Sequence, residues 1–252
     1  AASDVYKRQV KEVDTWKTKM YNDVYRLLEE YGCSLDIVYS DSEFYGTVTE
    51  SYSEVLTWTT GNEADSYLVV NLNNTMGYLS IQEAANAYAT CEGQVLFVKA
   101  GTYYENVVVD KAIGLVGENK ETTIISGDAN NTALTVACDG VKVTGFTVKN
   151  GGNVTAGTGG GIWLNSANNC VISDTVVTAN NFGIYLQKSC NNTLRNNNIF
   201  DNKYNFGVYG TTLSEYVNDV DLSNTVNGKP VCYWINQHDI VLPVDVGYVA
   251  LV

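Results

Sequence analysis

The feature that most constrains the fold of this chain is a repeated tetrapeptide. Gly-Ile-Trp-Leu begins at residue 161, Gly-Ile-Tyr-Leu at residue 183 and Gly-Val-Tyr-Gly at residue 207, so the motif recurs with a period in the low twenties. The first two segments continue with an Asn-rich turn and two short apolar runs that end at Asn180 and Asn202. A single coil of this length buries its inward side chains only when another coil stacks on it. We therefore predict an all-β fold, a right-handed single-stranded parallel β-helix.

The segments before the repeat fit the same fold. Between Gln94 and Val148 several short apolar runs follow one another, each bounded by Gly, Asn or Asp, which is typical of short strands joined by turns. Ser80 to Glu83 form a capping-box pattern that predicts a short helix ending at about Ala89. We expect the β-helix to cover residues 66–252, with an insertion at about 213–245.

The N-terminal quarter has a different pattern. From Val10 to Glu30 apolar residues recur at steps of three and four, which predicts an amphipathic helix that ends at Gly32. We interpret it as a helix laid on the neighbouring domain, with a short oligomerising coil as the alternative. Residues 1–65 are therefore expected to form a helical flank followed by a poorly specified segment. Both predicted helices are candidates to cover the open end of the first coil, because an uncovered coil exposes a strand edge.

The two ends of the sequence suggest a fragment of a longer protein. The first nine residues, AASDVYKRQ, resemble translated library-adaptor sequence from metagenomic reading frames and carry no weight in the fold prediction. The chain starts at Ala1 without methionine and stops at Val252 inside a run that is typical of a strand. We therefore expect the β-helix to be truncated at its C-terminal end.

The charge of the chain excludes two classes of partner. Its 15 Lys and Arg stand against 28 Asp and Glu, which gives a formal net charge of −13. Such a surface repels phosphate backbones and anionic lipid, so we expect no nucleic-acid binding. No run approaches the roughly 18 apolar residues of a membrane-spanning helix, so we also expect no direct membrane insertion of this fragment.

Four stretches carry a resemblance to a known family. SIQEAA at 80–85, FVKAGTYYENV at 97–107 and GLVGE at 114–118 resemble the opening coils of pectin-lyase-like proteins, notably the NosD-type branch. The stretch 224–236 is similar to an insertion of archaeal NosD-type surface proteins. The resemblance covers roughly 66–252 and implies an extracellular or cell-surface location, periplasmic in a bacterium. It implies the fold without assigning an activity, because the superfamily includes lyases, hydrolases, esterases and non-catalytic surface proteins.

An enzyme of acidic polysaccharide, a lyase or glycoside hydrolase, is the alternative function. The segment 101–105 resembles the GxYxE motif of pectin methylesterases, but the sequence has no Gln-Asp pair and no Asp-Asp pair for esterase or hydrolase chemistry. A lyase needs a base beside Ca²⁺-binding acids, so Ca²⁺ is the one cofactor left open. The weak catalytic candidates in neighbouring coils, which we otherwise interpret as solvated outward residues, are Asp174, Lys188, Arg195, Asp201 and Lys203.

Copper-site maturation, which the NosD resemblance implies, ranks lower. Copper favours Met, His or thiolate ligands, and Met20, Met76 and His238 do not cluster in the sequence. We expect no metal site. The cysteines show no CxxC pair, so we interpret them as buried free thiols, with disulfides as the alternative. They are Cys33, Cys91, Cys138, Cys170, Cys190 and Cys232.

The aromatic residues of the repeat are the candidate binding residues. Trp163, Tyr185 and Tyr209 each stand third in the tetrapeptide, so period-two alternation predicts that they form an outward stripe with Asn165 and Gln187 alongside. An aromatic face stacks on a sugar ring while amides bind its hydroxyls. The alternative is that the rings pack under the C-terminal insertion. We therefore predict a non-catalytic module for carbohydrate binding, adhesion or scaffolding, with a polysaccharide or cell-surface glycan as its partner.

Overall fold

A computed structural model describes most of the predicted β-helix. The described residues are 69–74, 76–152, 160–239, 241 and 244–252. Nearly all of them belong to one compact unit, Tyr67–Asn73 with Tyr78–Val252. The predicted amphipathic helix at 10–32 and the rest of the N-terminal flank lie outside the described residues, so they stay predictions.

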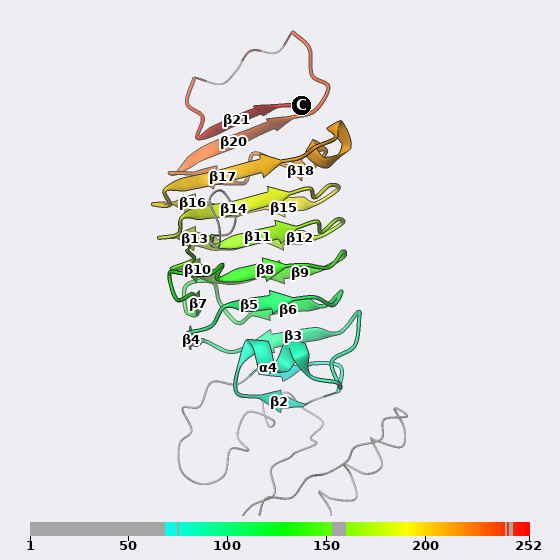
Figure 1. Ribbon diagram of the computed structural model, residues 1–252. Coiled ribbons are helices and arrows are strands. Elements are labelled where there is room, and N and C mark those ends of the chain that lie inside the picture. Colours follow the sequence, from blue (N-terminus) through cyan, green and yellow to red (C-terminus); the bar gives the residue numbers. More distant parts are fainter. Residues whose placement is uncertain (1–68, 75, 153–159, 240, 242–243) are drawn as a thin grey trace, which may run out of the picture. The chain divides into compact units, whose positions relative to one another are not determined.

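The chain winds through three sheets in the same order in every coil (Figure 1). The first two coils are β3 (Val95–Val98), β4 (Gly101–Tyr103), β5 (Val107–Val109), and β6 (Gly114–Gly117), β7 (Thr123–Ser126), β8 (Leu134–Val136). The next two are β9 (Lys142–Thr144), β10 (Thr147–Lys149), β11 (Ile162–Asn165), and β12 (Val171–Ser173), β13 (Val176–Thr178), β14 (Phe182–Gln187). The fifth is β15 (Thr193–Arg195), β16 (Asn198–Phe200) and β17 (Tyr204–Tyr209).

Every strand of these coils pairs in parallel with its counterpart in the next coil. The first sheet runs β15-β12-β9-β6-β3, the second β16-β13-β10-β7-β4 and the third β17-β14-β11-β8-β5. Each sheet therefore contains one strand from each coil, which confirms the predicted parallel β-helix.

The N-terminal end carries the predicted short helix. β1 (Val69–Asn71) pairs antiparallel with β3, and β2 (Gly77–Tyr78) precedes α4 (Ile81–Asn86). The Ser80 hydroxyl accepts a 3.0 Å hydrogen bond from the Glu83 N–H, which confirms the N-cap. Ile81, Ala84 and Ala85 of α4 are buried at the N-terminal end of the stack, where Figure 1 shows the helix. The helix is shorter than predicted, because the backbone turns extended at Ala87.

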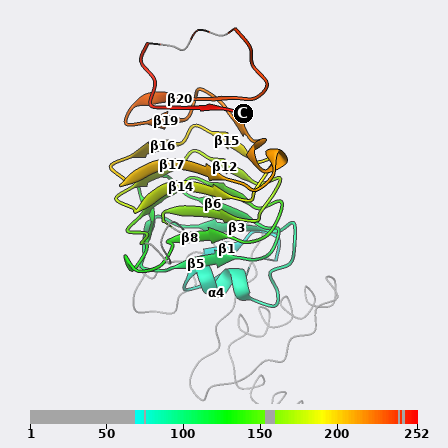
Figure 2. The ribbon, with the colours of Figure 1, turned by 45° about the horizontal axis from the view of Figure 1, so that its top comes forward.

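The C-terminal end continues the coils before it leaves them. β18 (Asp219–Val220) and β19 (Thr225–Val226) extend the first and second sheets, although they fall within the predicted insertion. The short 3₁₀ helix η1 (Leu213–Tyr216) precedes β18. β20 (Lys229–Trp234) then pairs antiparallel with β19 and parallel with β21 (Tyr248–Leu251). Figure 2 shows β19 and β20 at the C-terminal end of the stack.

The interior is a stack of aliphatic side chains in register. Ile162 pairs with Ile184 and Leu164 with Leu186 in the third sheet, and all four side chains are fully buried. The predicted period-two alternation is confirmed here, since the branched residues face the core. Burial of each such side chain contributes about 1.5 to 3 kcal/mol to the free energy of unfolding. This contribution exists only because a neighbouring coil covers the side chain.

Buried asparagines hold the corner between the first and second sheets. The Thr175 N–H and hydroxyl both donate to Asn197 Oδ1, at 3.2 and 2.7 Å. Asn197 Nδ2 in turn donates to the Ile172 carbonyl and to Asn224 Oδ1, at 2.8 Å each. These bonds run from coil to coil, so each amide satisfies backbone groups that the corner removes from the strand ladders.

The other two corners repeat this arrangement. Between the second and third sheets, Asn180 Nδ2 donates to Asn202 Oδ1 at 2.9 Å. Between the third and first sheets, Asn192 Nδ2 donates to Asn218 Oδ1 at 3.0 Å. The Asn-rich composition is therefore largely a property of the fold, with one ladder at each corner.

Candidate functional site

The outward face of the third sheet is rich in aromatic side chains. Trp163 of β11 lies opposite Tyr185 of β14, and Tyr185 lies opposite Gly207 of β17. Trp163 is half-buried, but Tyr185 is only 8% exposed. A Cβ on Gly207 would lie 3.2 Å from the Tyr185 ring, so that ring lies over the glycine. The prediction of Tyr185 as an exposed ring is therefore wrong, because the next coil offers no side chain to hold it outward.

Tyr209 occupies a different position from the one predicted. It pairs with Gln187 and not with Tyr185, because the register of β17 against β14 does not follow the repeated tetrapeptide: Gly207 lies opposite Tyr185 instead of Gly183. A shift of two positions keeps a side chain on the same face of a strand. Tyr209 is therefore still outward and is 46% exposed, but it lies one outward side-chain position further along the sheet.

Two further rings complete this face, and sequence reasoning missed both. The Phe182 and Tyr204 rings stack at 4.8 Å between centroids, and Phe182 lies 5.0 Å from Tyr185. Tyr204 is 50% exposed. Phe182 and Tyr204 are direct partners in the pairing of β14 with β17, so they recur at the coil period, which is a signal that the sequence contains. We call the set Trp163, Phe182, Tyr185, Tyr204, Tyr209 the aromatic surface.

Polar groups lie among these rings. The Trp163 indole N–H donates to Gln187 Oε1 at 3.1 Å, which fixes the amide beside the indole. Asn165 pairs in register with Gln187 and is half-buried. The Lys203 ammonium lies 5.2 Å from the Tyr204 ring centroid, within the range of a cation–π contact. Burial raises the pKa of Tyr185.

The predicted catalytic candidates other than Arg195 are spread over the three corners, and of these candidates only Asp201 and Lys203 share one. Asp174 lies at the corner between the first and second sheets, Asp201 and Lys203 lie between the second and third, and Lys188 lies between the third and first. Asp174, Lys188 and Asp201 have φ of 49°, 50° and 52°, so each occupies a left-handed turn position. The two acids therefore occupy different corners.

Arg195 is held in a surface ion-pair cluster. It forms ion pairs with Asp219 and, at 3.1 Å, with Asp221 of the next coil. Its guanidinium also donates to the carbonyls of Leu194 and Asp219. These contacts join two coils and occupy the donors that a catalytic arginine would direct at a substrate.

The segment that resembles the GxYxE motif has a structural role. The Tyr103 hydroxyl donates to the Lys99 carbonyl at 3.0 Å, and the ring is buried. The two carboxylate oxygens of Glu105 accept from the N–H groups of Ile81 and Gln82, at 2.9 Å each. Glu105 therefore binds the first N–H groups of α4, which have no partner within the helix.

The thiols of the described residues are all free. Cys138, Cys170 and Cys190 lie in the corner between the third and first sheets, but of these three only Cys170 is buried, as the interpretation required. Burial raises the pKa of Cys170 to about 11 and also raises that of Cys138. Cys91 is exposed, contrary to the interpretation as a buried thiol, because it lies in the loop before β3.

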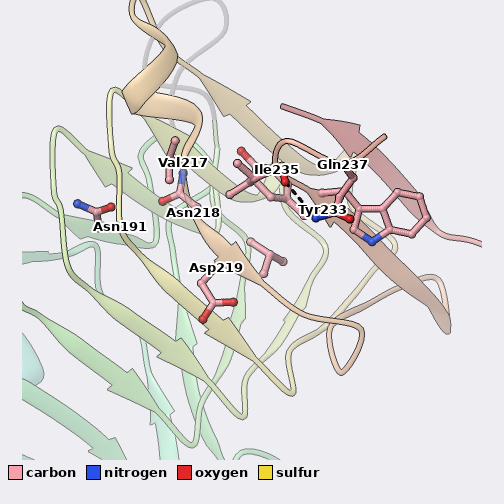
Figure 3. Close-up of a pocket in the computed structure, with 9 residues that line it drawn as sticks. Asn191, Val217, Asn218, Asp219, Tyr233, Ile235 and Gln237 are labelled. Carbon is pink, nitrogen blue, oxygen red and sulfur yellow. Dashed lines mark hydrogen bonds between the residues drawn. The ribbon is translucent and has the colours of Figure 1, made fainter. Parts of the chain in front are cut away.

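A hollow of about 550 Å³ lies near the C-terminal end of the β-helix (Figure 3). It is separate from the aromatic surface, since none of its lining residues belongs to that set. Its lining consists of Asn191, Val217, Asn218, Asp219, Val220, Tyr233, Trp234, Ile235 and Gln237.

Comparison with known proteins assigns the family. Residues 84–240 match the family described as periplasmic copper-binding protein (NosD). The chain belongs to the NosD family. This NosD-family chain is 31% identical over 109 residues to a cell surface glycoprotein of Methanothermus fervidus, a match covering 43% of this chain and 17% of the glycoprotein.

Two further similarities concern pectin enzymes. The NosD-family chain is 39% identical over 74 residues to probable pectinesterase/pectinesterase inhibitor 6 of Arabidopsis thaliana, covering 27% of this chain and 13% of that protein. The chain therefore spans less than a fifth of either curated relative. A crystal structure of pectin methylesterase in complex with hexasaccharide VII has 13% identity and a TM-score of 0.38, covering 64% of this chain and 56% of that one.

The residues of this NosD-family chain do not fit the copper of the family's description. Within the described ranges, no three His, Cys, Asp or Glu side chains gather where they would hold a metal ion. Copper binding by cysteine requires thiolate, and burial favours the protonated thiol at Cys170. Apart from the thiols, the soft-metal donors of the described part are Met76, which precedes β2, and His238, which follows β20, so they are distant in the chain.

Proposed function

We propose that this chain is a polysaccharide-binding β-helix module that works outside the cytoplasm and does not cleave its ligand. The observation that carries the proposal is the aromatic surface, where exposed Tyr204 and Tyr209 of β17 lie two coils from the half-buried Trp163, with its partner Gln187 in the coil between them. Clustered aromatic side chains on a rigid sheet, with fixed amides between them, have the chemistry of a sugar-stacking platform.

The geometry of the surface sets the length of the ligand. Trp163 and Tyr209 are two coils and one outward side-chain position apart, which corresponds to about 10 Å across the strands and about 7 Å along them. Their separation is thus about 12 Å, oblique to the strands. A glycan of two or three sugar units that crosses the strands diagonally would contact both rings.

The separate corners of Asp174, Asp201 and Lys188 support a binding role. Glycoside hydrolysis requires two carboxyl groups on opposite sides of one bond, at most about 10 Å apart. The motif that resembles a pectin methylesterase segment supplies Glu105 to a helix N-terminus instead of to a substrate. The match to a pectinesterase favours polysaccharide as the ligand class.

The family and the glycoprotein relative support a location outside the cytoplasm. The family is described as periplasmic, and the relative is named a cell surface protein. In the described part of the chain, no helix combines the length and the apolar character that crossing a bilayer requires. We propose that the module is displayed by a larger exported protein, in which several weak sites act together.

A glycan array with the whole chain tests the proposal. Tyr209→Ala removes an exposed ring of the aromatic surface, and Tyr88→Ala is the matched control because Tyr88 is 94% exposed after α4. We expect Tyr209→Ala to weaken binding to the glycans found on the array by about two- to tenfold, from the loss of one ring contact. Tyr88→Ala should leave it unchanged.

A product-release assay on the same glycans tests the enzymatic alternative. Unsaturated or reducing ends that appear with the parent chain and disappear with Asp174→Ala or Lys203→Ala would overturn the non-catalytic proposal. If the parent and Tyr209→Ala bound these glycans equally well, the proposal that the aromatic surface is the binding site would instead be wrong.

A further inference from the structure

The hollow near the C-terminal end lies between two parts of the chain that are distant in sequence. One wall comes from the corner between the third and first sheets, with Asn191 in one coil and the segment from Val217 to Val220 in the next. The other wall comes from Tyr233, Trp234 and the residues after β20. Figure 3 shows Asn191 and Asp219 on the corner side, with Ile235 and Gln237 on the other.

We propose that this hollow is a second carbohydrate site, which binds one or two units of a neutral sugar. Its volume of about 550 Å³ lies within the range of small-molecule sites. Trp234 is half-buried and supplies an aromatic side chain for stacking, while Asn191 and Gln237 supply exposed amides. The Gln237 Nε2 also donates to the Ile235 carbonyl at 3.3 Å (Figure 3), which leaves its Oε1 to accept from a ligand. Amides both donate and accept hydrogen bonds, as sugar hydroxyls do.

The floor of this site is held rigid by the fold. Asn218 is buried, accepts from the Asn192 N–H and Nδ2, and donates to the Ser189 carbonyl at 3.0 Å. The Tyr233 hydroxyl donates to the Tyr216 carbonyl, which ties β20 to the corner. A site whose walls are already hydrogen-bonded loses little conformational entropy on binding.

The charges beside the hollow favour a neutral ligand over a uronate. Asp219 lines the hollow, and its partner Arg195 also pairs with Asp221. One guanidinium thus faces two carboxylates, so the local charge is negative. A ligand carboxylate would meet this charge, whereas a sugar hydroxyl can donate to a carboxylate oxygen of Asp219.

The indole N–H resonances provide a test that separates the two sites. In the full chain labelled with ¹⁵N, Trp234 reports on the hollow and Trp163 on the aromatic surface. The probes are glucose, galactose, mannose, N-acetylglucosamine and their β-linked disaccharides, with galacturonate as the anionic comparator. We expect at least one neutral sugar to shift the Trp234 signal saturably, and galacturonate to bind at least several-fold more weakly.

Three variants test the assignment. Asn191→Gly removes the amide while retaining the left-handed backbone, since φ is 57°, and Gln237→Ala removes an exposed amide. Each should raise the dissociation constant reported by Trp234 about two- to tenfold, with an unchanged urea midpoint. Tyr209→Ala should leave it unchanged.

The inference fails if no neutral sugar shifts Trp234 saturably, or if both amide variants bind as the parent does. Preference for galacturonate would overturn the ligand class. This result does not depend on the aromatic surface. If longer glycans left the Trp163 indole signal unshifted, the proposed function would be contradicted, but sugar binding reported by the Trp234 signal would still stand.

Discussion

Removal of the Asn197 side chain should destabilise the β-helix far more than removal of its neighbour Asn198. Asn197 is 1% exposed and its amide takes part in four hydrogen bonds, two from Thr175, one to the Ile172 carbonyl and one to Asn224. Asn198 is exposed in β16 and accepts one bond from the Thr225 hydroxyl. Both substitutions are Asn→Ala, and the two residues are adjacent in the chain.

The magnitude follows from these bonds. A typical internal hydrogen bond contributes about 0.5 to 1.5 kcal/mol net, so four of them give about 4 kcal/mol. The Ile172 carbonyl and the Thr175 N–H also lose their hydrogen-bond partner inside the protein, because the alanine side chain can neither donate nor accept a hydrogen bond. For a unit of this size about 4 kcal/mol corresponds to a drop of roughly 8 to 16 °C in Tm. Asn198→Ala should cost less than about 1 kcal/mol, because water replaces its one exposed bond.

Urea unfolding followed by circular dichroism measures both variants. We expect Asn197→Ala to lower the midpoint at an unchanged slope, since the exposed area of the unfolded chain is the same. The reasoning would be refuted if Asn197→Ala lowered the free energy of unfolding by less than about 1 kcal/mol, or by no more than Asn198→Ala does. The asparagine ladder would then not be what stabilises this corner.

Three further predictions concern single side chains. Glu105→Ala should cost about 1 to 2 kcal/mol by urea unfolding, as loss of a helix cap does, and should leave glycan binding on the array unchanged; a loss of binding would contradict its structural role. Arg195→Met should cost less than about 1 kcal/mol, since its ion pairs are partly exposed, and added salt should reduce the difference from the parent. Cys170 should react with a thiol reagent far more slowly than exposed Cys91 at pH 8. Because the pKa of Cys170 is about 11 in the fold against 9.0 ordinarily, stability should fall as the pH rises from about 9 towards 11, and this slope should be smaller in Cys170→Ala than in the parent.

The sequence allowed the fold class to be predicted but not the register of the last full coil. The prediction matched Gly207 to Gly183, but the two glycines have different roles. A Cβ at Gly183 would lie 2.2 Å from the Asn205 carbonyl oxygen, so the backbone requires glycine there. Gly207 lies under the Tyr185 ring, and the core position opposite Ile184 belongs to Phe206. Matching on glycine therefore placed Tyr209 opposite the wrong partner.

Whether a given asparagine is buried or exposed also depends on the register between coils. Three consecutive asparagines take three different environments: Asn196 is an exposed left-handed turn residue with φ of 55°, Asn197 is in the ladder, and Asn198 is on an exposed strand face. All three have the same local composition around them. Only the pairing of coils decides which amide is buried, so the sequence indicated turns rather than ladders.

The same reasoning explains why polar residues in neighbouring coils did not form a site. Residues from successive coils meet when they occupy the same column of one sheet, as Ser173 and Arg195 do, or the same corner, as Thr175 and Asn197 do. Asp174 follows β12 and Asp201 follows β16, so the two acids share neither a column nor a corner. An acid at a left-handed corner is explained by the backbone, because Asp and Asn tolerate positive φ better than other side chains. The fold brings two ionisable groups together when they lie one coil apart in a single column or at the same corner, and the coils before Arg195 offer Thr144 and Ser173 in its column instead.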